Sequence, residues 1–254
     1  VAILLGKSPM TLFAGLGATS AVLMLVFKDT ILGLAAGVRL TSNDMLHKGD
    51  WITVKSVDAN GIVEDMSLTT VKVRNFDNTI VTISPATLVN GSFQNWIGMQ
   101  KSGGRRAKRI VYFDFRSIRL VDETLKQTLL AKHFATEDSF KLKESLQKAI
   151  EKDIQEGKDI EDLKNPAALA PTNLQLYRRF MEKYLRQRPE VNTELTLMVR
   201  HMEATQCGLP IEFYFFIKDK VWVNYEHILA DIMEHAYALA NEFGLKIYEQ
   251  YPEQ

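Results

Sequence analysis

Residue types that could support catalysis or metal binding are few, and their spacing does not suit either role. His227 and His235 lie eight positions apart on one predicted helix, whereas helical zinc sites use the spacing i, i+4. His201 and Cys207 supply at most half of a metal site. We therefore interpret all four as surface or core residues and predict that the protein holds no metal.

Adjacent carboxylates, which can act in general acid–base catalysis, occur at Glu64-Asp65 and at Glu161-Asp162. Neither pair has the apolar surroundings that would separate the two pKa values, so we interpret both as solvated. The sequence contains no P-loop, GxSxG, HExxH or GxGxxG motif. We predict no catalytic residues and no cofactor, and we predict that the protein is not an enzyme.

The basic run KSGGRRAKR, from Lys101 to Arg109, is the last candidate for binding chemistry. Glycines among charges are typical of a solvated hinge, so we predict a linker over residues 99–109, with a contact to phosphate or lipid headgroups as the alternative. A nucleic-acid binder is another function that such a run suggests. Lys plus Arg equals Asp plus Glu at 31 each, and no aromatic residues are interleaved with the basic ones. We therefore predict no nucleic-acid partner.

The most apolar stretch, from Met10 to Phe27, contains no charged residue. As a helix it would be roughly 27 Å long, which nearly spans the hydrocarbon core of a bilayer. Small residues occupy its first half, and they favour close packing against other helices. These small residues include Ala14, Gly17, Ala18 and Ala21. We predict a packed membrane core, in which Ala21 and Leu25 share one helical face.

The flanks of this stretch predict how residues 1–48 are organised. We expect residues 1–9 to be the end of an earlier membrane helix and its turn, and residues 10–48 to hold a membrane helix, a break and a second helix. Lys28 and Asp29 would be costly at bilayer depth, and Asp29 can cap a new helix, so we predict the break there. A single continuous helix is the alternative. The residues expected to set the packing of the interfacial second helix are Gly33, Gly37 and Arg39.

The 254-residue chain is long enough for two or three folded units, and its one cysteine excludes an intrachain disulfide. From Gly49 to Trp96 the hydrophobic period is two, with turn residues at Asp58–Gly61 and at Asp77-Asn78. Ser84-Pro85 can open a short helical turn. We predict five short strands, closed into a small Sm-like β-barrel over residues 49–98, because closure removes exposed strand edges.

Residues 110–254 predict an α+β domain in the order strand, helix, strand, strand, helix, strand, which is that of a ferredoxin-like sandwich. The strands are expected at 110–115, 193–199, 211–217 and 246–248, and the helices at 118–133 and 225–243, the latter capped by Asn224. Residues 134–190, rich in Lys and Glu, are expected to be a helical insertion. Within it we predict one helix over Ser139–Glu156 and another that is capped by Thr172 or Asn173 and ends before Pro189.

The order of these parts, together with a set of short motifs, resembles the mechanosensitive channel of small conductance (MscS) family and, within it, the miniconductance, YbdG-type branch. The motifs are Leu34-Ala35-Ala36-Gly37-Val38, His47-Lys48-Gly49-Asp50-Trp51-Ile52, Gly61 to Met66, Thr69 to Arg74, and Ile83 with Gly91 to Trp96. They cover Met10 to about Trp96, and the region as far as Tyr248 follows more loosely. Ala21 departs from the Leu that is usual in the family.

This resemblance implies a homo-oligomer, heptameric in the family, whose inner helices line one central pore for inorganic ions and small solutes. It places Ala14, Gly17 and Ala18 on the packed helix seam and turns Ala21 and Leu25 toward the axis, with Leu25 as the main constriction. The implied function is a tension-gated channel of the bacterial inner membrane that opens under hypoosmotic stress, with its C-terminal domains in the cytoplasm. A membrane-tethered scaffold without conductance is the alternative function.

Overall fold

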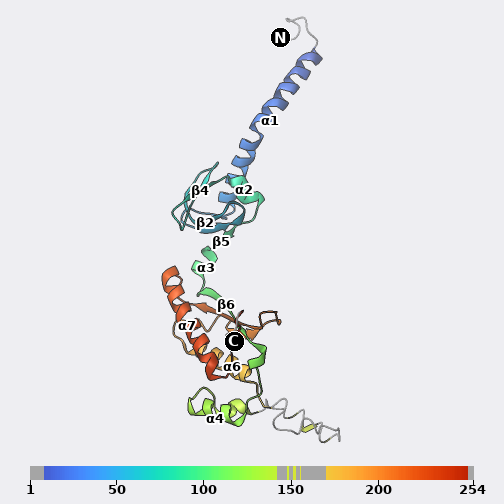
Figure 1. Cartoon of the computed structure of the whole chain (residues 1–254). Helices are drawn as coiled ribbons and strands as arrows, with labels where there is room; N and C mark the ends of the chain where they lie inside the picture. The colour runs from blue at the N-terminus through green and yellow to red at the C-terminus, as the bar shows by residue number, and fades with distance from the viewer. Residues whose placement is uncertain (1–8, 142–147, 149–150, 153–154, 156–169, 251–254) are drawn as a thin grey trace. The chain divides into compact units, whose positions relative to one another are not determined.

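The computed structural model of the chain describes residues 9–141, 148, 151–152, 155 and 170–250. The chain divides into two compact units, Val1–Lys101 and Ser102–Gln254. The first unit is a long helix followed by a β domain, and the second is an α+β domain (Figure 1). This order of elements confirms the predicted fold class.

The first helix, α1, runs from Pro9 to Ser42 without interruption. The break predicted at Lys28 and Asp29 is therefore wrong, and the continuous helix is the correct alternative. Extending an existing helix adds one hydrogen bond for each residue fixed, whereas a new helix needs a costly nucleus, and neither residue removes a backbone donor as proline does. Within α1, Phe13–Ser42 is long and apolar enough to cross a membrane, with a mean hydropathy of 1.9.

All five strands predicted for the β domain are present. They are β1 (Trp51–Val54), β2 (Ala59–Met66), β3 (Val71–Asn75), β4 (Ile80–Ile83) and β5 (Gln94–Asn95). They form an antiparallel sheet in the order β4-β3-β2-β1-β5. A 3-10 turn, η1 (Lys55–Val57), joins β1 to β2, and α3 (Ile97–Lys101) follows β5.

The sheet differs from a closed barrel in one respect. Among the described residues no hydrogen-bonded ladder joins β4 to β5, so these two strands remain the edges. The helix predicted at Ser84-Pro85 is present as α2 (Pro85–Asn90), and the Ser84 hydroxyl caps it by accepting from the Thr87 amide at 3.2 Å. Leu40 near the end of α1 and Leu88 of α2 are buried in one core with the alternate inward residues of the strands. Helical side chains thus complete the core of the curved sheet.

The second unit has the predicted ferredoxin-like topology. Its sheet is β6 (Arg105–Phe113), β8 (Leu209–Ile217) and β7 (Met198–His201), antiparallel in the order β6-β8-β7. The predicted fourth strand is reduced to a short pairing on the outer edge of β6. There the Tyr248 amide donates to the Tyr112 carbonyl at 2.8 Å, and the Asp114 amide donates to the Lys246 carbonyl at 2.9 Å.

The basic residues at the start of β6 correct the predicted linker over residues 99–109. Arg105 already pairs with Ile217 of β8, so only Ser102 to Gly104 separate α3 from β6. The run is a strand because Ala107 faces the core while Arg106 and Lys108 alternate with it on the other face. The basic residues are therefore part of a paired strand rather than a hinge.

The helices of this unit show that the predicted insertion, residues 134–190, is only partly peripheral. After η2 (Phe115–Ser117), α4 (Glu123–Ala131) and η3 (Glu137–Phe140), the helix α6 (Asn173–Gln187) begins at the predicted Thr172 cap. Tyr177 of α6 is fully buried and donates to the Ala236 carbonyl at 2.6 Å. Most of the helix predicted over Ser139–Glu156 lies outside the described residues.

The last helix, α7 (Trp222–Glu242), begins before its predicted cap. The Asn224 side chain does not cap α7, since it donates to Asp219 at 2.8 Å. Tyr225 and Leu229 of this helix are buried in the same core as Phe213 of β8. α6 and α7 both belong to this core, so the long Lys-rich region contributes to the stability of the sheet.

A buried carboxylate lies on the outward side of β8. Glu212 has no accessible surface, and its two oxygens lie 2.7 Å from Arg200 NH2 and 3.3 Å from Lys108 Nζ. Burial alone would raise the pKa of Glu212, but the hydrogen bonds from Arg200 and Lys108 outweigh it, so the pKa is lowered below its usual 4.5. The ionised form therefore stabilises the folded sheet.

We expect the α+β unit to lose stability in acid, because a group with a lowered folded pKa contributes above its unfolded pKa and stops contributing as the pH falls through the folded pKa. Glu212→Gln should lower the free energy of unfolding near neutral pH by about 1–3 kcal/mol. It should also flatten the dependence of stability on pH below about pH 5. Urea unfolding of both proteins across this pH range measures the effect, and parallel curves would contradict the assignment.

Candidate functional site

The predicted pore-lining residues lie along one face of α1. Each residue of a helix is rotated by about 100° from the one before it. On this basis the five predicted residues all lie within an arc of about 100° around the helix axis. These residues are Ala14, Gly17, Ala18, Ala21 and Leu25. Four are small, so identical helices could approach one another closely along this face, and Leu25 is the one large side chain in the set.

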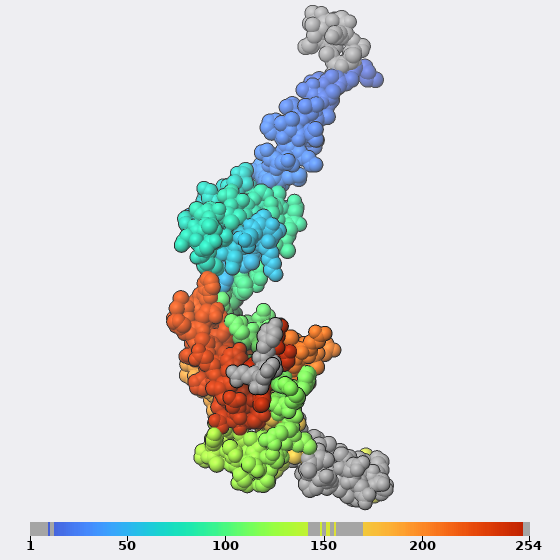
Figure 2. Space-filling view, viewed as in Figure 1, coloured from blue at the N-terminus to red at the C-terminus, as the bar shows by residue number. Residues whose placement is uncertain are grey.

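A second face of α1, centred about 120° away, carries the large apolar side chains. These are Phe13, Leu16, Leu23, Met24 and Phe27. Every residue from Phe13 to Leu32 is exposed, and Leu25 is 74% exposed. Figure 2 shows this helix (blue) uncovered as far as the β domain. An apolar surface of this extent requires lipid or other helices around it.

The other end of α1 is fixed to the β domain through Gly37. Ala36, Gly37 and Leu40 are buried, and a Cβ atom at position 37 would overlap the backbone carbonyl of Leu68. Glycine is therefore required for this close approach of helix and loop. The sequence suggested Gly37 as a packing residue, but its partner Leu68 had no recognisable signal.

The two other residues predicted for this segment have different surroundings. A Cβ atom at Gly33 would meet nothing within 4 Å, and Arg39 is exposed. In this chain, therefore, the contact with the β domain depends on Gly37 and not on Gly33. The arrangement of a separate interfacial helix does not apply to the continuous α1.

The link between α1 and β1 is held by Asp50, which is 6% exposed. One oxygen of its carboxylate accepts from the His47 amide at 3.0 Å and from the Asn95 side chain at 2.8 Å. Gly49 has φ +94 and donates to the Val63 carbonyl at 2.8 Å. The Gly-Asp pair thus turns the chain into the sheet and ties the turn to β5.

Replacing Asp50 should loosen this link. Asp50→Ala leaves the His47 amide without its acceptor and removes one of the two acceptors of the Asn95 amide group, and we expect a loss of about 1–3 kcal/mol in the free energy of unfolding. Asp44→Asn is the control, because Asp44 is exposed, its ion pair within the described residues is with the His47 ring, and asparagine tolerates the left-handed backbone at this position. Denaturant unfolding of the two variants and wild type measures the difference, and equal stability of the two variants would contradict the role of Asp50.

The candidates for metal binding and catalysis do not form a site in the described part of the chain. No group of three His, Cys, Asp or Glu side chains there could hold a metal ion. His235 stacks on Tyr184 with the ring centroids 5.7 Å apart, and its Nδ1 lies 2.9 Å from the Asp231 carbonyl oxygen. Cys207 is an exposed free thiol.

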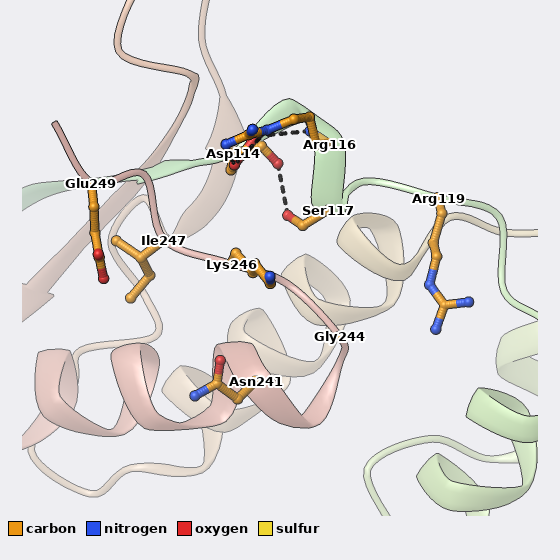
Figure 3. A pocket seen from close by; sticks show the side chains of 9 residues that line it. All are labelled: Asp114, Arg116, Ser117, Arg119, Asn241, Gly244, Lys246, Ile247 and Glu249. Atoms are coloured by element: carbon orange, nitrogen blue, oxygen red, sulfur yellow. Dashed lines mark hydrogen bonds and ion pairs between the residues drawn. The ribbon is translucent and has the colours of Figure 1, made fainter. Parts of the chain in front are cut away.

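The second unit has an open cleft of about 860 Å³ beside the short fourth strand (Figure 3). Arg116, Arg119 and Lys246 line it. Asp114 holds Arg116 through a two-pronged ion pair with contacts of 2.6–3.1 Å, and Arg119 pairs with Asp122 outside the lining. Most of the positive charge in this cleft is therefore neutralised by neighbouring carboxylates.

Comparison with known proteins was decisive for the β domain. Residues 29–98 match the family model described as "Mechanosensitive ion channel, beta-domain". Over this β domain the chain belongs to the MscS family. Members of this family are ion channels rather than enzymes. The YbdG-type branch stays a prediction.

Two archaeal relatives of this MscS-family chain come from Methanocaldococcus jannaschii. The small-conductance mechanosensitive channel MscMJ is 33% identical over 90 residues, which are 35% of this chain and 25% of that protein. The large-conductance channel MscMJLR is 30% identical over 127 residues, which are 50% of this chain and 35% of that protein. The chain therefore spans about a quarter to a third of the length of these relatives.

Solved structures of the MscS type have the same fold. The cryo-EM structure of Arabidopsis thaliana MSL1 has a TM-score of 0.62 at 11% identity and covers 98% of this chain and 69% of that one. The crystal structure of Helicobacter pylori MscS in the closed state has a TM-score of 0.59 at 12% identity, with coverages of 98% and 74%. At these identities the likeness concerns the fold alone.

Proposed function

We propose that this protein is a tension-gated ion channel in which several copies of α1 surround one central pore. The observation that carries the proposal is α1 itself, an exposed apolar helix with a small-residue face, attached at Gly37 to a mechanosensitive-channel β domain. Such a helix is stable when lipid covers the face with the large apolar side chains and other copies of α1 cover the face with the small residues.

In this arrangement Leu25 forms the narrow apolar ring. A ring of large apolar side chains closes a pore by excluding water, so ions cannot pass even though no plug is present. Because Ala21 is small, Leu25 carries the constriction. Lys28 and Asp29 lie one turn further along the same face, so the dry region would end there.

Gating follows from the areas of the two states. Tension in a bilayer favours the state that occupies more membrane area, and only this difference between the states can shift their populations. Tilting the copies of α1 outward widens the pore and enlarges the membrane area. The packing of small residues at Ala14, Gly17 and Ala18 allows adjacent helices to slide during this change.

The proposal includes the assembly and the cellular location. Seven identical copies in the bacterial inner membrane, with the C-terminal domains in the cytoplasm, would release inorganic ions and small solutes under hypoosmotic stress. The MscS-family fold and the single candidate span in the described residues support this arrangement. Mass measurement of the detergent-solubilised complex gives the number of copies.

Patch recording of the protein reconstituted in liposomes tests the function. We expect discrete currents that appear only above a threshold of applied suction and disappear when it is released. A stable oligomer that never conducts at tensions up to membrane rupture would favour the membrane-tethered scaffold instead.

A further inference from the structure

A second cleft in the α+β unit, of about 310 Å³, lies between α6 and the loop that follows α4. Arg179, Lys183 and Tyr184 line it from α6, and His133 and Phe134 line it from the loop. No Asp or Glu is among its lining residues. The charged side chains of the described cleft are thus of one sign, which favours an anionic ligand.

The positive charges of this cleft are not neutralised locally. Arg179 and Lys183 are four positions apart on α6, so they lie on the same helical face, and both are exposed. Neither forms an ion pair within the described residues. In the first cleft, by contrast, Asp114 holds Arg116 (Figure 3), and Arg119 pairs with Asp122. The two clefts therefore differ in their capacity to attract an anion.

His133 lines the rim of this cleft. It follows α4 with φ +58, a left-handed conformation in which Gly or Asn is usual at the end of a helix. Its imidazole adds a polar group to a lining that also contains Arg179 and Lys183.

The remaining wall of the cleft is aromatic and rigidly packed. The rings of Phe134 and Phe180 meet edge to face with centroids 5.2 Å apart, and both contact Phe243 behind them. The Tyr184 ring stacks on the His235 ring with the centroids 5.7 Å apart. The Arg188 guanidinium lies over the Tyr184 ring, 5.8 Å from its centroid. A flat apolar group can pack on such a wall without reordering it.

We propose that this cleft binds a nucleoside phosphate. Arg179 and Lys183 would hold the phosphate, because guanidinium and ammonium groups form short charge-assisted hydrogen bonds with phosphate oxygens. The rings of Phe134 and Phe180 would hold the base. The volume of the cleft lies at the lower end of the range for small-ligand pockets, which suits a mononucleotide.

Calorimetric titration of the detergent-solubilised full-length protein with AMP, and separately with inorganic phosphate, tests the proposal. We expect saturable AMP binding that weakens at least about tenfold in Arg179→Gln/Lys183→Gln, because two charge-assisted hydrogen bonds are lost. Arg116→Gln/Lys246→Gln is the control, since it removes the same charge from the first cleft. The control should bind AMP as wild type does.

Several outcomes would overturn the nucleotide site. These are the absence of saturable AMP binding to wild type, equal binding by wild type and the Arg179/Lys183 variant, and inorganic phosphate binding as tightly as AMP. The last would remove any role for the aromatic wall. Binding is measured without conductance, so its failure leaves the channel proposal unaffected, and a non-conducting protein could still bind AMP.

Discussion

Leu25→Ser is expected to produce a channel that leaks at low tension. In the proposed pore Leu25 is the one large apolar side chain among the five predicted pore-lining residues, and serine would replace its apolar surface with a hydroxyl group that holds water. Removing a leucine side chain from an apolar contact costs about 1.5–3 kcal/mol per copy, and several copies contribute at once. The closed state should therefore lose enough stability to raise the resting open probability at least about tenfold.

Leu23→Ser is the matched control for this prediction. It makes the same chemical change two residues earlier on α1, on the face that carries the large apolar side chains. Patch recordings should show a lowered threshold and steady leak for Leu25→Ser, with the threshold of Leu23→Ser close to that of wild type. The same leak in both variants would show that Leu25 has no special place in the constriction.

Gly37→Val is expected to separate α1 from the β domain. The new side chain would overlap the Leu68 carbonyl, which belongs to the backbone and cannot move aside as a flexible side chain could. Overpacking of this kind typically costs about 1–3 kcal/mol, and more where the backbone must shift. Because α1 and the β domain would then move independently, the tension needed for opening should change as well.

Gly33→Val provides the control for the Gly37 prediction. It places the same side chain one helical turn away, where a Cβ atom meets nothing in this chain. We expect limited proteolysis between α1 and β1 to be faster, and the free energy of unfolding lower, for Gly37→Val alone. Equal protease resistance of the two variants would contradict the role of the Leu68 contact.

The β domain was the part of the fold most accessible from sequence. Its strands alternate apolar and polar residues because one face of the sheet is buried. Val71 and Val73 face the core, whereas Lys72 and Arg74 face solvent. Turn residues bounded each strand. Local pattern and tertiary structure agree there, so the number of strands and the α2 cap were predicted correctly.

The errors arose where a local signal competed with tertiary structure. Arg105 to Arg109 look like a linker by charge, yet pairing with β8 makes them a strand. α6 looks peripheral because its many charged residues mask the buried stripe that contains Tyr177 and Met181. Lys28 and Asp29 could cap a helix, but both are exposed, and none of the residues that the structure describes packs against them to stabilise a bend.

The candidate site was only partly visible from sequence for a related reason. The small residues of α1 and Leu25 could be found from composition and period alone, and their roles remain proposals. Contacts between distant segments, such as Gly37 with Leu68 or Asp50 with Asn95, produce no periodic pattern of residue types in the sequence. The charge of the second cleft likewise depends on which side chains the fold brings together.

The continuity of α1 makes the helix a lever whose fulcrum is the buried contact near Leu40. Leu25 lies 15 residues from Leu40, roughly 22 Å along the axis, and Pro9 lies 31 residues away, roughly 46 Å. Any rotation about the fulcrum therefore displaces the far end about twice as far as Leu25. Lateral force from the bilayer on the outer turns would act on the proposed constriction with a mechanical advantage of about two, whereas a hinge at Lys28 would leave the turns between Lys28 and Leu40 unmoved.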